Sequence, residues 1–87
     1  MHFGNNIEKF GFEKSGWPIT EVNEYPDGSQ EIYMGKSIKP EPSTGEPVWL
    51  VRKITIRKGT STTIIIEQTN DWKNIWDDRK SLEYHLI

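Results

Sequence analysis

The sequence predicts a mainly β protein, a small antiparallel β-sandwich or barrel-like domain with a short C-terminal helical turn. Three observations lead to this fold class. A strong turn signal at residues 25–29 separates two stretches of alternating polarity, residues 48–68 have the pattern of a second hairpin, and 87 residues suffice for one small core. We therefore expect a single β-rich domain at residues 17–87, preceded by an N-terminal arm at residues 1–16.

The arm is expected because the apolar residues of its sequence follow neither a helical nor a strand period. Phe3, Phe10 and Phe12 are its candidates for contact with a neighbouring subunit. The same spacing also fits a loosely packed chain terminus, so the residues alone leave both interpretations open.

The first hairpin is expected to join a strand at residues 17–24 to a strand at residues 30–35. Pro18 disfavours a helical conformation of the residue before it, which favours an extended start. The Pro-Asp-Gly sequence inside residues 25–29 presets a tight turn and supplies residues that tolerate positive φ. Gly35 is expected to end the second strand or to form a bulge in it.

The second hairpin follows a connector at residues 36–47, which contains three prolines and no hydrophobic period. Residues 48–58 form the longest strand candidate, and residues 61–68 return beside it. The returning strand contains three consecutive isoleucines. If only one side of the sheet is covered, Ile65 is left exposed and favours aggregation, unless a second sheet, the arm or a partner chain covers it.

The C-terminal stretch is expected to close the core. Residues 70–79 place large side chains at i, i+3, i+4 and i+7, which predicts a short helix, and residues 81–87 alternate like a closing strand. Arg79 is expected to pin this helix, by pairing with Asp71 or Asp78 or by stacking on Trp76. The residues expected to close the core are Trp49, Ile54, Trp72, Ile75, Trp76, Arg79, Leu82 and Tyr84.

No catalytic, metal-binding or cofactor-binding pattern is present in the sequence. The chain has no cysteine, its two histidines stand near opposite ends, and the adjacent Asp77 and Asp78 side chains would point apart on a helix. We therefore predict a non-enzymatic protein without catalytic residues, metal or cofactor. A net charge of −2 without a basic block argues against nucleic acid, and no apolar run is long enough for a membrane span.

Several large side chains remain as candidates for partner contact, namely Trp17, Tyr33 and Ile65 together with the phenylalanines of the arm. Aromatic rings on a β scaffold also stack on sugars, and Trp17, Tyr25 and Tyr33 are the rings that such a surface would use. A carbohydrate- or receptor-binding module is therefore an alternative function.

Three segments of the chain, in this order, resemble a small module of tailed-bacteriophage virion proteins. In that family they read as aromatic-x-Gly-Lys, then Trp-x-x-Arg/Lys-x-Ile, then Phe-x-Asn-Val/Ile-Trp-x-x-Arg-x-x-Leu-x-Tyr. The corresponding segments here are residues 31–36, residues 49–54 and residues 72–84, and the similarity covers about residues 20–86. The last segment is the most specific, although Trp72 stands where the family usually has Phe and the connector is rich in proline.

The resemblance implies a non-enzymatic structural protein that oligomerises or docks on a capsid, neck, tail or fibre component. Its partners are then other virion proteins, further copies of the chain among them. Its expected location is the virion, after assembly in the host cytoplasm. A third hypothesis is a small phage-encoded inhibitor of a host protein.

Overall fold

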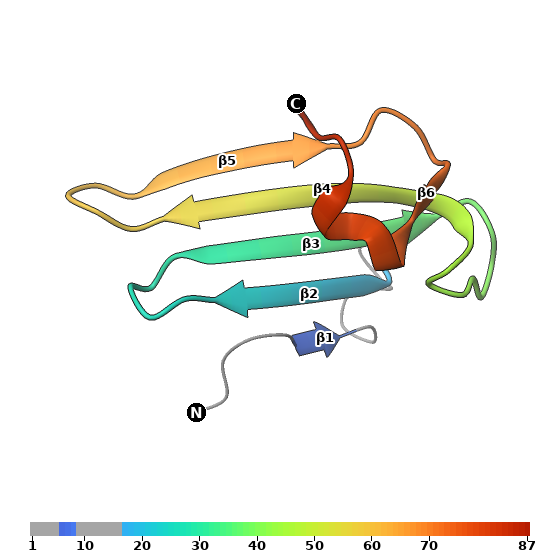
Figure 1. Cartoon of the computed structure of the whole chain (residues 1–87), viewed down its shortest axis with the longest axis horizontal. Helices are drawn as coiled ribbons and strands as arrows, with labels where there is room; N and C mark the ends of the chain where they lie inside the picture. Colours follow the sequence, from blue (N-terminus) through green and yellow to red (C-terminus); the bar gives the residue numbers. More distant parts are fainter. Residues whose placement is uncertain (1–5, 9–16) are drawn as a thin grey trace.

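The computed structural model describes residues 6–8 and 17–87 (Figure 1). Within these residues the chain forms one open antiparallel sheet and one 3-10 helix. The predicted mainly β fold with a helical turn near the C-terminus is confirmed, but the sheet does not close into a barrel or a sandwich. The elements are β1 (Asn6–Glu8), β2 (Ile19–Glu24), β3 (Gln30–Ser37), β4 (Pro47–Arg57), β5 (Thr63–Gln68), β6 (Asn74–Ile75), η2 (Trp76–Ser81) and β7 (His85–Leu86).

The strand order in the described sheet is β1-β2-β3-β4-β5-β7. The long strand β4 is paired along one side by β3 and along the other by two shorter strands. Residues 52–57 of β4 pair with β5, and Pro47 and Trp49 pair with β6. The chain therefore passes from β5 to β6 along the same side of β4, and η2 then crosses in front of the sheet (Figure 1).

The first hairpin turns where the sequence predicts it. The Tyr25 N–H donates to the Ser29 carbonyl and the Gly28 N–H donates to the Tyr25 carbonyl, both at 2.9 Å. Gly28 has a φ of 88°, a conformation that a residue without Cβ adopts without strain. Gly35, in contrast, neither ends nor bulges its strand, because β3 continues to Ser37 in unbroken register with β4.

The register assigns the side chains to two faces, because residues directly opposite each other in antiparallel strands share a face. On the face crossed by η2, which we call the covered face, Ile19 pairs with Gly35 and Gly35 with Val51. The opposite face carries a row of apolar residues from four neighbouring strands. We call this row the isoleucine ladder; it consists of Val22, Ile32, Ile54 and Ile66.

The predicted helix at residues 70–79 is wrong. The segment contains β6 and the start of η2 instead, because polar side chains compete for the backbone groups that a helix needs. The Asp71 carboxylate accepts a hydrogen bond from the Lys73 N–H at 2.9 Å. The Asn74 amide donates to the carbonyls of Asp71 and Trp49, at 2.8 and 3.0 Å. The chain is thus tied to β4 before η2 begins.

The two ends of the chain also differ from the sequence pattern. The closing strand expected at residues 81–87 is reduced to β7, because η2 extends to Ser81 and Leu86 is exposed. Within the expected arm, β1 pairs with β2. Phe3, Phe10 and Phe12 lie outside the described residues.

Candidate functional site

The covered face holds the core of the described domain, and Trp76 is its centre. Trp76 is 1% exposed and packs against Trp49, with ring centroids 5.9 Å apart. Its ring lies directly over Gly35, where a Cβ atom would be 2.7 Å from Trp76 Cε3. The glycine therefore provides the space for the ring. The buried core consists of Ile19, Tyr33, Trp49, Val51 and Trp76, with Val48, Leu82 and Tyr84 packed against it.

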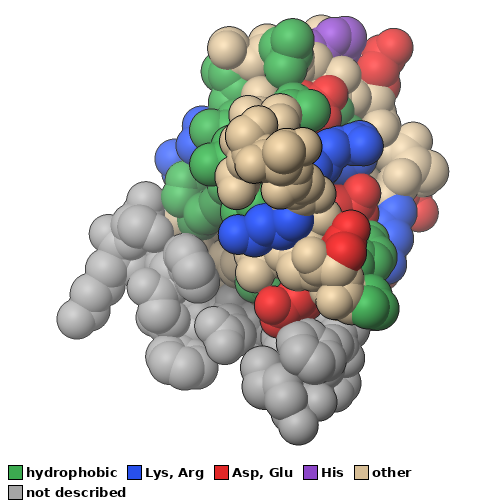
Figure 2. All heavy atoms as spheres, turned by 90° about the vertical axis from the view of Figure 1, so that its left-hand side faces the viewer, with side chains coloured by type: hydrophobic (Ala, Val, Ile, Leu, Met, Phe, Trp, Pro, Cys, Tyr) green, Lys and Arg blue, Asp and Glu red, His purple; other side chains and the backbone are tan. Residues whose placement is uncertain are grey.

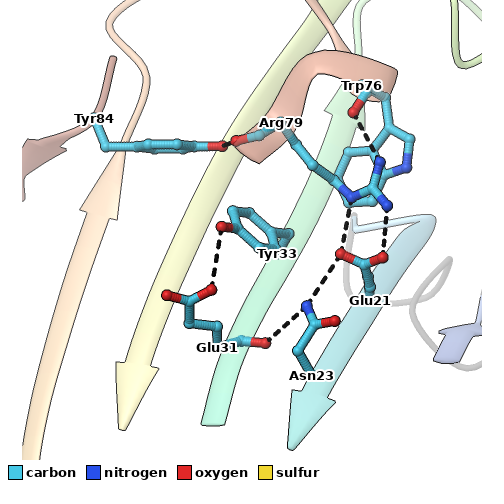
Figure 3. A network of polar contacts seen from close by, with 7 residues as sticks. All are labelled: Glu21, Asn23, Glu31, Tyr33, Trp76, Arg79 and Tyr84. Carbon is cyan, nitrogen blue, oxygen red and sulfur yellow. Dashed lines mark hydrogen bonds and ion pairs between the residues drawn. The ribbon is translucent and has the colours of Figure 1, made fainter. Parts of the chain in front are cut away.

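A buried ion pair fastens η2 to β2 (Figure 3). Glu21 is fully buried, and its carboxylate accepts two hydrogen bonds from Arg79, Nε to Oε1 at 2.9 Å and Nη2 to Oε2 at 2.5 Å. The guanidinium also lies 4.9 Å from the centroid of the Trp76 ring, as one of the two sequence hypotheses for Arg79 stated. The other hypothesis, pairing with Asp71 or Asp78, is wrong, because the carboxylate comes from 58 positions away in the chain.

The polar network around this pair extends across β3 to the C-terminal segment. The Asn23 amide donates to the Glu21 carboxylate at 3.2 Å, and the Tyr84 hydroxyl donates to the Arg79 carbonyl at 2.5 Å. The Tyr33 ring lies between Tyr84 and Glu21 (Figure 3), and its hydroxyl donates to the Glu31 carboxylate at 3.4 Å. Tyr33 is 2% exposed, so its expected role in partner contact is wrong: β3 turns this ring toward η2 and Tyr84.

The ionisation of this network is set by burial and by its hydrogen bonds. Burial alone raises the pKa of Glu21, but the hydrogen bonds from Arg79 and Asn23 outweigh it, so the pKa is lowered overall. Burial and the charge of Glu31 raise the pKa of Tyr33 to about 12. At neutral pH the carboxylate is therefore charged and the phenol neutral. The arrangement is suited to holding η2 in place rather than to exchanging protons.

Trp17 lies at one end of the opposite face, between two cations. Lys36 Nζ is 5.1 Å and the Arg52 guanidinium carbon 4.8 Å from its ring centroid, and Arg52 also donates twice to Gln68 Oε1. With Tyr33 buried on the covered face, Trp17, Tyr25 and Tyr33 do not share one surface. A sugar-binding surface that uses all three rings together, one form of the carbohydrate-binding alternative, is therefore not formed.

One open hollow of about 630 Å³ lies beside the connector between β3 and β4. Its walls include Trp49, Pro42 and two lysines, of which Lys39 forms an ion pair with Glu46. The Ser37 hydroxyl in this wall accepts a hydrogen bond from the Lys39 N–H at 2.9 Å. Across residues 6–8 and 17–87, no three His, Cys, Asp or Glu residues lie close enough together to hold a metal ion, and no helix is long and apolar enough to cross a membrane.

The isoleucine ladder is the most prominent apolar feature outside the core. Ile56 and Ile64 form a second, shorter row beside it, and Ile64 and Ile66 are 60% and 42% exposed. Figure 2 shows hydrophobic side chains gathered on the left side of the view and acidic side chains mostly away from it, whereas basic side chains lie on both sides. Within the described chain η2 is the segment laid across the sheet, and it lies on the covered face (Figure 1).

The sequence indicates Ile65 as the isoleucine at risk of exposure, but Ile64 and Ile66 are the exposed ones. Ile65 is half-buried on the covered face opposite Thr55, whereas its two neighbours are exposed on the ladder side. The same register places Ile54 in the ladder and not under η2, so its expected role in closing the core is wrong. Trp72 and Ile75 are half-buried outside the buried core, because they precede η2 instead of sharing a helix face with Trp76.

Two residues of the core were missed by the sequence analysis. Glu21 stands in an alternating stretch with other polar residues and reads as solvent-facing, and Gly35 reads as a strand end. The signal that was available for Gly35 is its place in the middle of an otherwise continuous strand pattern, since glycine there often marks a close approach by another group.

Comparison of the chain with family models, with curated proteins and with solved structures finds no match. The resemblance to phage virion modules therefore stays a prediction from the three sequence segments described above. Two residues of the most specific segment, Trp76 and Arg79, are the ones that fasten η2 to the sheet.

Proposed function

We propose that this chain is a non-enzymatic structural protein of a tailed-phage particle that binds other virion proteins through the isoleucine ladder. The observation that carries the proposal is an apolar row across four strands that ends in an exposed residue, Ile66, and that no element of the described chain crosses. Exposed apolar patches of this kind are typical of protein interaction sites.

The composition of the two faces supports an assembly role. On the covered face, Tyr33, Trp49 and Trp76 form the buried core, and the ion pair of Glu21 and Arg79 lies beside them. The opposite face, which carries the isoleucine ladder, has β-branched side chains on its surface, and two of them, Ile64 and Ile66, are exposed to water. Full burial of an isoleucine side chain contributes roughly 1.5–3 kcal/mol, so covering Ile64 and Ile66 favours association with a partner.

The lack of cysteine also supports an assembly role. The chain has no cysteine, so no disulfide or zinc–thiolate site adds to its small core. Association with a partner stabilises a small domain by mass action, because the partner binds the folded state only. The resemblance to virion modules supports a phage particle as the assembly.

The proposal is tested by locating the chain in purified particles of the phage that encodes it. We expect mass spectrometry to find it at a constant ratio to the other virion proteins. The variant Ile66→Lys is expected to be folded but depleted from particles, because the lysine charge is placed at the end of the ladder.

The matched control is Ile38→Lys, since Ile38 is also exposed, at 65%, but lies in the connector. Both variants are compared by circular dichroism and thermal unfolding before particles are counted. Absence of the wild-type chain from purified particles overturns the proposal. Recovery of the chain on a host protein instead supports the inhibitor hypothesis.

A further inference from the structure

The outer edge of β5 is partly unpaired in the described chain. β7 covers this edge only opposite Glu67 and Gln68, and the Ile87 N–H donates to the Ile66 carbonyl at 3.4 Å. Backbone groups of alternate residues in a strand point to the same side. The N–H and C=O of Ile64 therefore point away from β4, as those of Ile66 do. The Ile66 carbonyl is taken by Ile87, whereas within residues 6–8 and 17–87 no backbone group pairs with Ile64 on this side.

This edge lacks the features by which monomeric proteins protect an exposed strand. Such edges are usually shielded by charged residues, proline or a bulge. Here residues 59–66 contain no charge and no proline, in a chain that is 28% charged. The pairing of β5 with β4 runs in unbroken register. The backbone groups of this edge can therefore form hydrogen bonds with a further strand.

We propose that β5 pairs antiparallel with β5 of a second copy of this chain, around a two-fold axis at Ile64. The inference deepens the proposed function and depends on it for its biological use. A two-fold axis perpendicular to the sheet keeps each face of the sheet on the same side, and directly opposed residues share a face. The residue at the axis therefore lies opposite the same residue of the second copy. The accessible window runs from the turn at residues 59–62 to Ile66, which Ile87 already faces, and Ile64 lies in its middle.

The chemistry of this register favours a second copy. Ile64 faces Ile64, so the two residues exchange both backbone hydrogen bonds, and Thr63 of each copy faces Ile65 of the other. The pairing is limited to residues 63–65, because Ile87 of the same chain already lies opposite Ile66. No charged residue lies within this stretch, so the two strands meet without unpaired or like charges. The axis also keeps equivalent faces on the same side, and the short row of Ile56 and Ile64 continues directly into the second copy.

The size of the contact sets the expected affinity. A standard interface buries about 800 Å² on each partner, and pairing along a few residues of one strand is well below that. The free dimer is therefore weak and forms at high protein concentration. In a particle, neighbouring attachment sites raise the effective concentration, so the same pairing is populated there.

The cysteine-free sequence allows a direct test by single substitutions in the full chain. Residues in a hydrogen-bonded antiparallel pair have Cα atoms about 5.5 Å apart, which is within disulfide range. Under mild oxidation Ile64→Cys is expected to form disulfide dimers about tenfold faster than Ile38→Cys, a control of similar exposure, because paired thiols react at a high effective concentration. Ile66→Cys is expected to behave like the control, because its copy lies several residues away along the strand.

Sedimentation equilibrium provides the second measurement. The wild-type chain is expected to show a concentration-dependent monomer–dimer equilibrium, and Ile64→Lys is expected to remain monomeric with an unchanged circular dichroism spectrum. A wild-type chain that is monomeric at all soluble concentrations, or equal cross-linking rates for the Ile64→Cys and Ile38→Cys variants, overturns the inference. A monomer that is nevertheless present in purified particles overturns only this pairing, whereas a dimer absent from particles overturns only the virion role.

Discussion

Replacement of Gly35 by alanine is the most direct test of how η2 closes the sheet. The added Cβ atom would lie 2.7 Å from Ile19 Cγ2 and 2.7 Å from Trp76 Cε3. Carbon atoms in contact prefer separations of about 3.5–4.0 Å, so the ring or the strand has to move by most of an ångström. Neither neighbour is a flexible side-chain end, since Ile19 and Trp76 are both buried in the core.

The expected loss in unfolding free energy is about 1–3 kcal/mol, the usual range for overpacking a close-packed core. The alanine restricts the unfolded chain and so offsets about 0.4–1 kcal/mol of that loss. Urea unfolding followed by tryptophan fluorescence measures the difference. Gly45→Ala is the matched control, because its Cβ would meet only Asp77 Oδ2 at 3.7 Å, and it is expected to change stability little.

A double-mutant cycle separates steric overlap from other effects of the alanine. In a Trp76→Ala background the overlap with the ring is removed and only the contact with Ile19 remains, so Gly35→Ala is expected to be clearly less destabilising there than in the wild type. If Gly35→Ala is as stable as the wild type, or equally destabilising in both backgrounds, the packing of Trp76 on Gly35 does not determine how η2 is placed.

Three further predictions concern the same domain. Trp76→Ala is expected to lower the unfolding free energy by about 3–5 kcal/mol, because the ring is fully buried, and normal folding with failed assembly would show that the ring is a contact instead. Arg79→Met is expected to cost about 3–5 kcal/mol at neutral pH, because it leaves the Glu21 carboxylate buried and unpaired, and thermal unfolding should show a smaller cost in acid, where that carboxyl is protonated. Deletion of residues 1–12, which removes β1, is expected to preserve cooperative unfolding but to reduce incorporation into particles, and loss of the cooperative transition would contradict this.

The ionisation of Glu21 gives the wild-type chain a defined pH dependence. The pKa of this carboxyl is lowered in the folded state, so its contribution to stability is present above the ordinary carboxyl pKa and is lost as the pH falls through the folded value. Unfolding measured along an acid titration should therefore show a loss that is absent from Glu21→Gln. A parallel loss in both proteins would assign the acid sensitivity to other carboxyl groups.

The elements determined by local chemistry were predictable from the sequence. These elements are the Pro-Asp-Gly turn, the strands on either side of it and the second hairpin. They depend on backbone preferences and on a period of two, and both can be recognised from residues that are close together in the sequence. The place of Trp76 at the closure also follows from its neighbourhood, a large ring beside a possible helical turn just after the last long strand.

Other features were decided by contacts between distant parts of the chain. Glu21 is buried because Arg79 comes to it across 58 positions, and Gly35 is needed because a ring from η2 lies on it. The three consecutive isoleucines of β5 do not indicate which face of the strand is exposed, and the register with β4 decided that Ile64 and Ile66 face water while Ile65 is half-buried. A strand pattern specifies that two faces differ, but which face is covered depends on where the C-terminal segment crosses the sheet.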